Sequence, residues 1–139
     1  MAQNIVEAGR SNAEYGLVMT STLGAPTVAD RNSAGPANAR LLWDAGVIYG
    51  YGTDTALLPR DALRHELTLL KLVFSNEEIV DILTKSAAYA VRRDDALGTL
   101  ESGKIGDAVI LDGDPLTDLD DLFNVRVVIR TGRIVMDNR

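Results

Sequence analysis

Residues Gly46 to Leu67 read GVIYGYGTDTALLPRDALRHEL, and this stretch decides the fold. Its apolar run, VIYGYG, does not alternate with polar residues, which is typical of a strand covered on both faces. The run stops at Gly52-Thr53-Asp54, and a helical pattern begins soon afterwards, with Asp61 as a candidate N-cap. An acid directly after a buried strand can simply cap a turn, because Asp side chains bond nearby backbone N–H groups. It can equally belong to a functional site, so Asp54 is the first candidate residue for chemistry.

The segments around this stretch follow a strand–helix–strand–helix order. The expected elements are a strand over 17–24, a loop over 25–36, a helix over 37–46, a strand over 47–52 and a helix over 62–74. Gly46 can end its helix because glycine adopts the left-handed conformation at low cost. The helix over 62–74 places four apolar residues on one face: Leu63, Leu67, Leu70 and Phe74. This order, with short connections, predicts the α/β class with a parallel sheet or barrel.

A further helix has a clear start at Ser75. Ser75 and Glu78 form the S-x-x-E pattern of a capping box. The apolar residues that follow at helical spacing are Ile79, Ile82, Leu83, Ala87 and Ala90. Near Asp94 the helical periodicity gives way to short strands and turns. We therefore divide the chain into two predicted domains, residues 1–94 and residues 95–139.

The second predicted domain is a small β structure. A strand is expected over 107–111, and VRVVIRTGRIVMD, residues 125–137, predicts a β-hairpin that turns at Thr131-Gly132. Between them lie five acids counted from Asp112 to Asp121. They lack the D-x-D-x-D-G spacing and terminal Glu of an EF-hand loop, so we expect a solvated turn.

The composition excludes several classes of protein. The chain has 139 residues, 46% hydrophobic and 24% charged, as in one soluble domain or part of one. A net charge of −6, with no basic cluster beyond Arg92-Arg93, argues against a nucleic-acid partner. No apolar run approaches the ~20 residues of a membrane helix. Residues 1–16 do not resemble a signal peptide, and without cysteine there are no disulfides. We therefore expect a cytoplasmic protein with no membrane partner.

Residues 97–116, LGTLESGKIGDAVILDGDPL, closely resemble the C-terminal signature of the metal-dependent amidohydrolase superfamily, in its imidazolonepropionase-like and prolidase-like branch. In that family a similar segment leads from a β/α barrel into a small β-sandwich. VRVVIRTGRIV resembles the hairpin that closes the sandwich. Gly52-Thr53-Asp54 resembles the end of the eighth barrel strand, and LRHELTLL the helix after it. The order of the pieces agrees with the family from Leu17 onward, although Gly106 replaces the usual Ala.

The resemblance implies a fold and a function. Residues 1–94 would form the last strand–helix units of a (β/α)8 TIM-type barrel, and residues 95–139 part of a composite β-sandwich. The protein would hydrolyse C–N bonds in a small-molecule amide, peptide or cyclic amide. Asp54 would bind a divalent metal, preferably zinc. The full-length parent would hold one or two such ions. Asp54 would also act as general base, taking a proton from the attacking water and delivering it to the leaving nitrogen. Thr55 would contact the substrate.

Other polar residues have simpler explanations. His65, the one histidine of the chain, points away from the Leu63/Leu67/Leu70 face, so a solvent-facing or capping role is favoured over substrate contact. Arg92-Arg93 follow a predicted helix and complement its dipole. The hydroxyl of Thr53 either orients Asp54 or packs at the strand end.

The chain lacks most of the ligands that the resemblance requires. A hydrolytic zinc site uses three protein ligands, whereas this chain has one His and no Cys. A whole β/α barrel needs ~250 residues, so the resemblance implies a C-terminal third, completed by a missing barrel segment in cis or trans. Because these ligands are missing, we expect the isolated chain to be inactive. Because strands with uncovered edges tend to associate, we also expect it to be oligomeric or marginally folded. Two alternatives stay open: a non-catalytic fragment or assembly subunit that completes a partner's barrel, and a free-standing α/β domain that records only ancestry.

Overall fold

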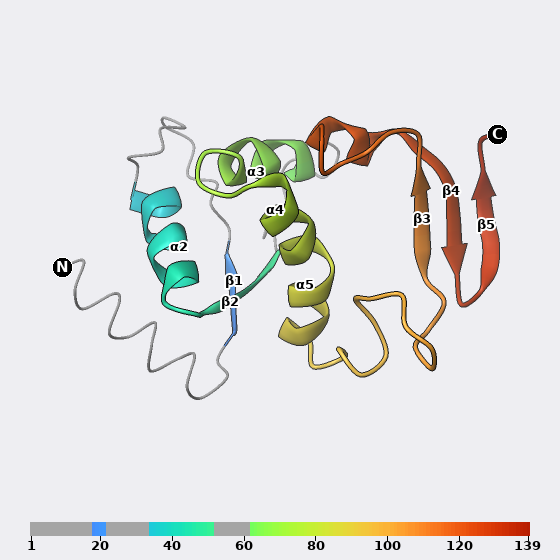
Figure 1. Ribbon diagram of the computed structural model, residues 1–139, viewed down its shortest axis with the longest axis horizontal. Coiled ribbons are helices and arrows are strands. Elements are labelled where there is room, and N and C mark those ends of the chain that lie inside the picture. Colours follow the sequence, from blue (N-terminus) through green and yellow to red (C-terminus); the bar gives the residue numbers. More distant parts are fainter. Residues whose placement is uncertain (1–17, 22–33, 52–61) are drawn as a thin grey trace.

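The computed structural model describes residues 18–21, 34–51 and 62–139 and has a mixed α/β architecture, as predicted (Figure 1). Its elements in chain order are β1 Val18–Ser21, α2 Ala34–Asp44, β2 Ile48–Tyr51, α3 Ala62–Leu70, α4 Asn76–Leu83, α5 Lys85–Ala90, β3 Ala108–Leu111, the 3₁₀ helix η1 Leu119–Phe123, β4 Val125–Arg130 and β5 Arg133–Asp137. The described strands form two separate sheets, β1-β2 and β3-β4-β5. No helix among these residues combines the length and the apolarity needed to cross a bilayer.

Strands β1 and β2 pair in parallel, which confirms the strand–helix–strand prediction. Their register runs from Val18 opposite Ile48 to Ser21 opposite Tyr51, so both strands end at the same edge. The connecting helix α2 ends before Gly46, whose φ of 88° is the left-handed conformation expected at this position.

Helices α2, α3 and α4 enclose the apolar core around β2 (Figure 1). The predicted face of α3 is confirmed, since Leu67 and Leu70 are buried and Leu63 packs against them. Phe74 is also buried and meets Trp43 of α2 edge to face, with ring centroids 5.5 Å apart. Such aromatic pairs stabilise a core by ~0.5–1.5 kcal/mol beyond the area they bury. Tyr49 is a further aromatic residue of this core, whose other buried residues are aliphatic.

Both downstream helices are shorter than predicted. The helix expected over 62–74 ends at Leu70, and the chain then tightens, with Val73 N–H donating to the Leu70 carbonyl. It must leave the helix here because Ser75, as N-cap of α4, adopts extended φ and ψ angles of −73° and 163°. The predicted capping box is confirmed in both directions: the Ser75 hydroxyl accepts from Glu78 N–H, and the Glu78 side chain accepts from Ser75 N–H.

The second helical stretch divides at Thr84. Its hydroxyl donates to the Val80 carbonyl at 2.7 Å, and its φ and ψ angles of −118° and −86° lie outside the helical region. A threonine that bonds backward in this way competes with the helix and bends it. Helix α5 therefore starts in a new direction and packs across β2 (Figure 1). A Cβ added to Gly50 would lie 2.6 Å from the Ala90 Cβ, so glycine permits this close approach.

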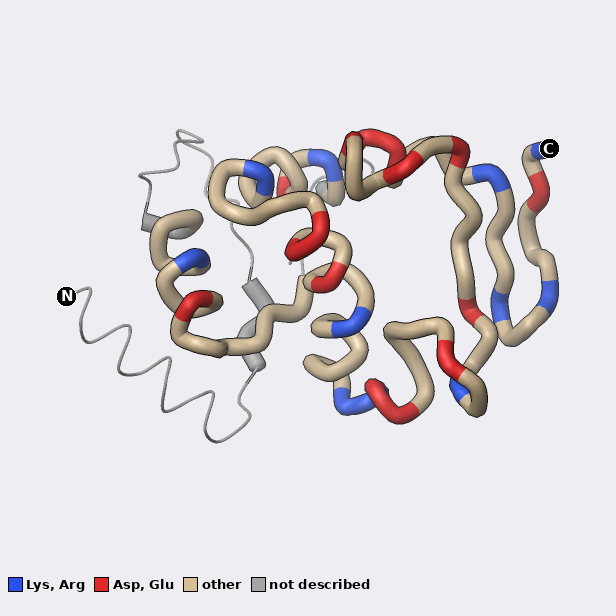
Figure 2. Tube along the Cα trace, viewed as in Figure 1, with Lys and Arg blue, Asp and Glu red and all other residues tan. Residues whose placement is uncertain are grey.

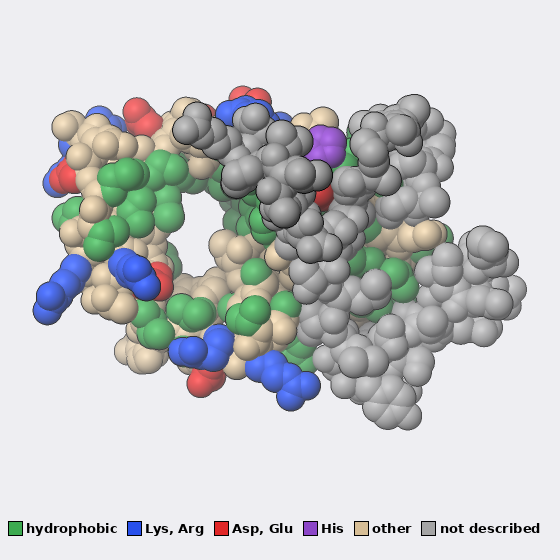
Figure 3. Space-filling model, turned by 180° about the vertical axis from the view of Figure 1, so that it is seen from behind, with side chains coloured by type: hydrophobic (Ala, Val, Ile, Leu, Met, Phe, Trp, Pro, Cys, Tyr) green, Lys and Arg blue, Asp and Glu red, His purple; other side chains and the backbone are tan. Residues whose placement is uncertain are grey.

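The C-terminal sheet has the order β3-β4-β5 and is antiparallel throughout. The predicted hairpin is confirmed: Thr131 and Gly132 connect β4 to β5 with φ angles of 49° and 74°. Positive φ at both positions is the type I′ geometry that matches strand twist. Several exposed apolar side chains lie on this sheet: Val109, Ile110, Ile134, Val135 and Met136. Figure 3 shows apolar side chains on one face of the sheet, seen from behind.

The segment between β3 and β4 attaches this sheet to the helices. Leu119 of η1 is only 1% exposed and belongs to the same core as α3 and α4. The Arg64 guanidinium of α3 stacks over the Phe123 ring, 3.9 Å from its centroid. The Asn76 side-chain amide donates to the Leu116 carbonyl at 3.1 Å. In Figure 2 the acidic residues of this segment gather where it meets α3.

Candidate functional site

The carboxyl edge of the parallel strand pair is the starting point for the site. Ser21 and Tyr51, the last paired residues of β1 and β2, lie side by side at this edge. From Tyr51 the sequence continues directly into Gly52-Thr53-Asp54. Asp54 and Thr55, the two predicted site residues, lie outside the described residues, as do Thr53 and the predicted cap Asp61. In β/α folds, side chains that carry out chemistry come from this edge.

His65 does not join a site in the described part of the chain. Its side chain is exposed on α3, which confirms the solvent-facing prediction. Within residues 18–21, 34–51 and 62–139, no three His, Cys, Asp or Glu residues are close enough to share a metal ion. The described residues therefore do not by themselves form a metal centre.

The acidic segment that follows β3 forms a hydrogen-bonded, solvated turn, as predicted. The Asp118 carboxylate accepts from Asp120 N–H at 3.0 Å and caps η1. Asp121 accepts from Asp114 N–H at 2.9 Å and from the Asn124 side-chain amide at 2.8 Å. Gly113 has a φ of 135° and packs against Asp121, so close that a Cβ would clash. These carboxylates therefore accept hydrogen bonds from groups within the turn and stabilise it.

A small enclosed cavity beside β2 contains polar groups that the sequence prediction missed. Its walls are formed by residues of β2 and of the surrounding helices: Ala39, Tyr49, Gly50, Tyr51, Glu66, Leu70, Phe74 and Ile82. Glu66 is only 3% exposed. A pattern in the sequence could have found it, because Glu66 lies three residues after Leu63 and four before Leu70, on the same helical face.

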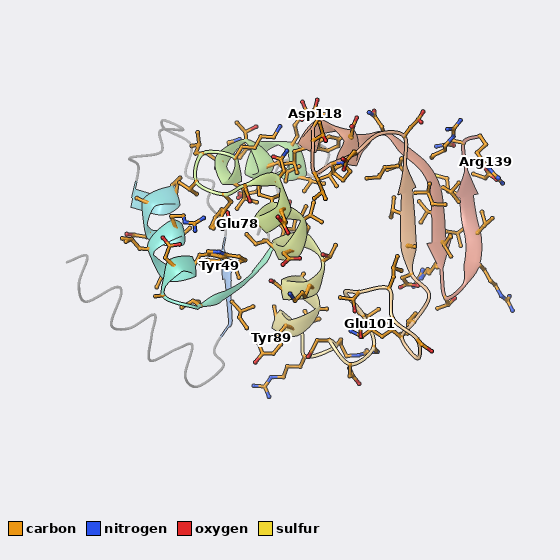
Figure 4. All side chains as sticks on the ribbon, in the orientation of Figure 1. Tyr49, Glu78, Tyr89, Glu101, Asp118 and Arg139 are labelled. Carbon is orange, nitrogen blue, oxygen red and sulfur yellow. The ribbon has the colours of Figure 1, made fainter. Side chains whose placement is uncertain are left out.

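Burial changes the acidity of the two tyrosines of β2. Desolvation raises the pKa of Tyr49 to about 12. Desolvation, followed by the negative charge of Glu66, raises the pKa of Tyr51 above its ordinary value. Figure 4 shows Tyr49 on β2 between α2 and α4. Both phenols are therefore neutral at physiological pH.

Comparison with known proteins gives consistent results. The sequence matches the amidohydrolase family over residues 13–135. An imidazolonepropionase from Porphyromonas gingivalis is 32% identical over 123 residues, covering 81% of this chain and 28% of that protein. A crystal structure of an amidohydrolase has a TM-score of 0.73 and 25% identity, covering 94% of this chain and 37% of that one.

A more distant structure shares the fold. A variant of atrazine chlorohydrolase from Arthrobacter aurescens, complexed with zinc and atraton, has a TM-score of 0.62 and 23% identity. The match covers 95% of this chain and 34% of that one. The chain spans about a quarter of the length of the curated relatives it matches. The matched region includes both the helical part and the C-terminal sheet.

Proposed function

We propose, from the premise that this chain belongs to the amidohydrolase family, that it forms the C-terminal part of a metal-dependent hydrolase of C–N bonds. The family consists of metal-dependent hydrolases, which is the activity that the sequence resemblance implies. The observation that carries the proposal is the family match over residues 13–135, which spans both sheets and the carboxyl edge that continues into Asp54.

Asp54 is the proposed metal ligand and general base. Its place in the sequence, just past a strand whose parallel partner ends at the same edge, supports this role. A bound divalent metal lowers the pKa of a coordinated water toward ~7. The Asp54 carboxylate would accept a proton from the attacking water and pass it to the leaving nitrogen. The hydroxyl of Thr55 would contact the substrate.

The remaining metal ligands are proposed to come from outside this sequence. One His and no Cys are present, and the described residues bring no ligand set together. A barrel segment in cis or trans would supply the histidines. Zinc is the proposed ion, supported by the zinc-bound chlorohydrolase that shares the fold. We further propose that residues 1–94 belong to a β/α barrel and residues 95–139 to a β-sandwich, in a cytoplasmic protein.

The proposed substrate is a small molecule with an amide, peptide or cyclic amide bond. The name of the Porphyromonas gingivalis relative supports a cyclic amide. To test this, the protein is purified from its natural host through an affinity tag placed after Arg139, so that any preceding or associated segment is retained. Hydrolysis of an imidazolone and of an acyl-proline dipeptide is measured before and after chelation.

Turnover that is lost on chelation and restored by added zinc supports the proposal. If the purified protein includes a full set of metal ligands and still hydrolyses no C–N bond in either substrate class, the alternative is favoured. That alternative is a non-catalytic subunit that completes a partner's barrel. Associated chains are identified from the same preparation by mass spectrometry.

A further inference from the structure

The hydroxyl oxygen of Tyr51 is an exception among the buried polar atoms of the described residues. It is inaccessible to solvent and has no hydrogen-bond partner there. Nine in ten or more buried polar groups in proteins have a partner, either another protein group or an ordered water. Leaving a buried donor unsatisfied costs about 1–3 kcal/mol. The position of Tyr51 at the last residue of β2 makes its partner important for how this strand end is held.

The cavity beside Tyr51 has the size and the chemistry of a water site. The space open to the centre of a water-sized sphere is about 10 Å³, roughly what one water molecule needs. Three residues of its lining carry polar side chains: Tyr49 and Tyr51 of β2 and Glu66 of α3. A carboxyl group has several acceptor positions, so Glu66 can accept from a water whatever else it contacts. The other lining residues are apolar side chains and one glycine. Of the two phenols, the one that lacks a partner among the described residues is that of Tyr51, which makes Tyr51 the donor that needs a water.

We propose that one water molecule binds in this cavity, accepts a hydrogen bond from the Tyr51 hydroxyl and donates one to the Glu66 carboxyl group. The bridge joins the end of β2 to α3. The Tyr51 ring packs against the apolar core, and the water bridge would fix its hydroxyl. The end of β2 would therefore be held at two points of the same side chain. Under the proposed function, the metal ligand Asp54 follows Tyr51 three residues later in the sequence. The water site itself is independent of that function, since it involves neither metal nor substrate.

A double-mutant cycle on the full chain tests the bridge. Tyr51→Phe removes only the hydroxyl oxygen, and Glu66→Met replaces the carboxyl group by an apolar side chain of similar length. In the wild-type background we expect Tyr51→Phe to lower the folding equilibrium constant about fivefold, the typical effect of one lost hydrogen bond. In the Glu66→Met background the same change should have no effect or should stabilise, because the hydroxyl would already be unsatisfied.

Tyr89→Phe on α5 serves as the matched control and should have equal effects in both backgrounds. If Tyr51→Phe leaves the wild-type stability unchanged or raises it, the bridge does not exist. A high-resolution crystal structure gives an independent answer if Glu66→Met does not fold. Density for a water ~2.8 Å from both the Tyr51 hydroxyl and a Glu66 oxygen supports the site, and an empty cavity overturns it. Neither result depends on Asp54, so failure here is distinguishable from failure of the proposed function.

Discussion

The Arg40 guanidinium of α2 donates to both carboxylate oxygens of Glu78 on α4, at 2.9 Å each. Glu78 also accepts from Ser75 N–H at 2.8 Å, so one carboxylate caps its own helix and ties it to α2. Partial burial acts to raise the pKa of Glu78, but the bonds from Ser75 and Arg40 outweigh it and lower the pKa below its ordinary value near 4.5. Helix capping and the contact between two helices therefore depend on the same charge.

We predict that Glu78→Gln destabilises the chain at pH 7 by about 0.5–1 kcal/mol, because the pair is partly exposed. A carboxyl whose pKa is lowered by folding adds stability above its unfolded pKa, and this stability is lost as the pH falls through the folded pKa. Denaturation of the variant and of the wild type should therefore show a larger difference in stability at pH 7 than at pH 3. Glu77→Gln removes an exposed charge from the same helical turn and is the control; an equal loss in both variants would contradict a specific role for Arg40.

Leu119→Ala should destabilise the attachment of η1 by about 2–4 kcal/mol, the usual range for a buried Leu. Leu116→Ala is the matched control, since Leu116 is 54% exposed and three residues away. Thermal melts monitored by circular dichroism measure both. If the two variants melt at the same temperature, η1 does not anchor the C-terminal sheet.

Gly50→Ala should destabilise the chain by about 1–3 kcal/mol, because its methyl group would overlap the Ala90 Cβ. The compensating variant Ala90→Gly removes that atom. In the Ala90→Gly background we expect Gly50→Ala to lose most of its effect, measured by urea denaturation. Additive losses would show that the strand and α5 do not meet at this point.

The turn of the hairpin gives two opposite effects. Thr131 is β-branched and has a φ of 49°, a conformation that asparagine adopts more readily, so Thr131→Asn should stabilise by about 0.5–1 kcal/mol. Gly132 has open space around it but a φ of 74°, so Gly132→Ala should destabilise by ~1 kcal/mol through backbone strain alone. Denaturant midpoints of the two variants should move in opposite directions, and a shift of the same sign would contradict a type I′ turn.

The features that the sequence predicted well are those set by local chemistry. The Ser75–Glu78 capping box, the Thr131-Gly132 turn and the exposure of His65 follow from a few neighbouring residues. The parallel pairing of β1 and β2 follows from the order of elements and from apolar runs without alternation. All four are confirmed.

The features that the sequence did not predict depend on contacts between distant segments. The early end of α3 at Leu70 is required by the extended conformation of Ser75. The burial of Leu119 depends on helices that precede it by about fifty residues. The cavity between Tyr51 and Glu66 exists only once α3 lies against β2. The roles of Asp54 and Thr55 remain predictions, since both lie outside the described residues.

The most direct test of the central claim is the effect of Asp54→Asn on the protein purified through a tag after Arg139. Turnover and bound metal per molecule are measured together, with Asp95→Asn, an exposed acid on the opposite side of the predicted domain boundary, as control. We predict that Asp54→Asn lowers kcat at least ~100-fold, as expected for loss of a general base, and reduces bound metal, whereas Asp95→Asn changes neither. Full activity and full metal content in Asp54→Asn would contradict the claim.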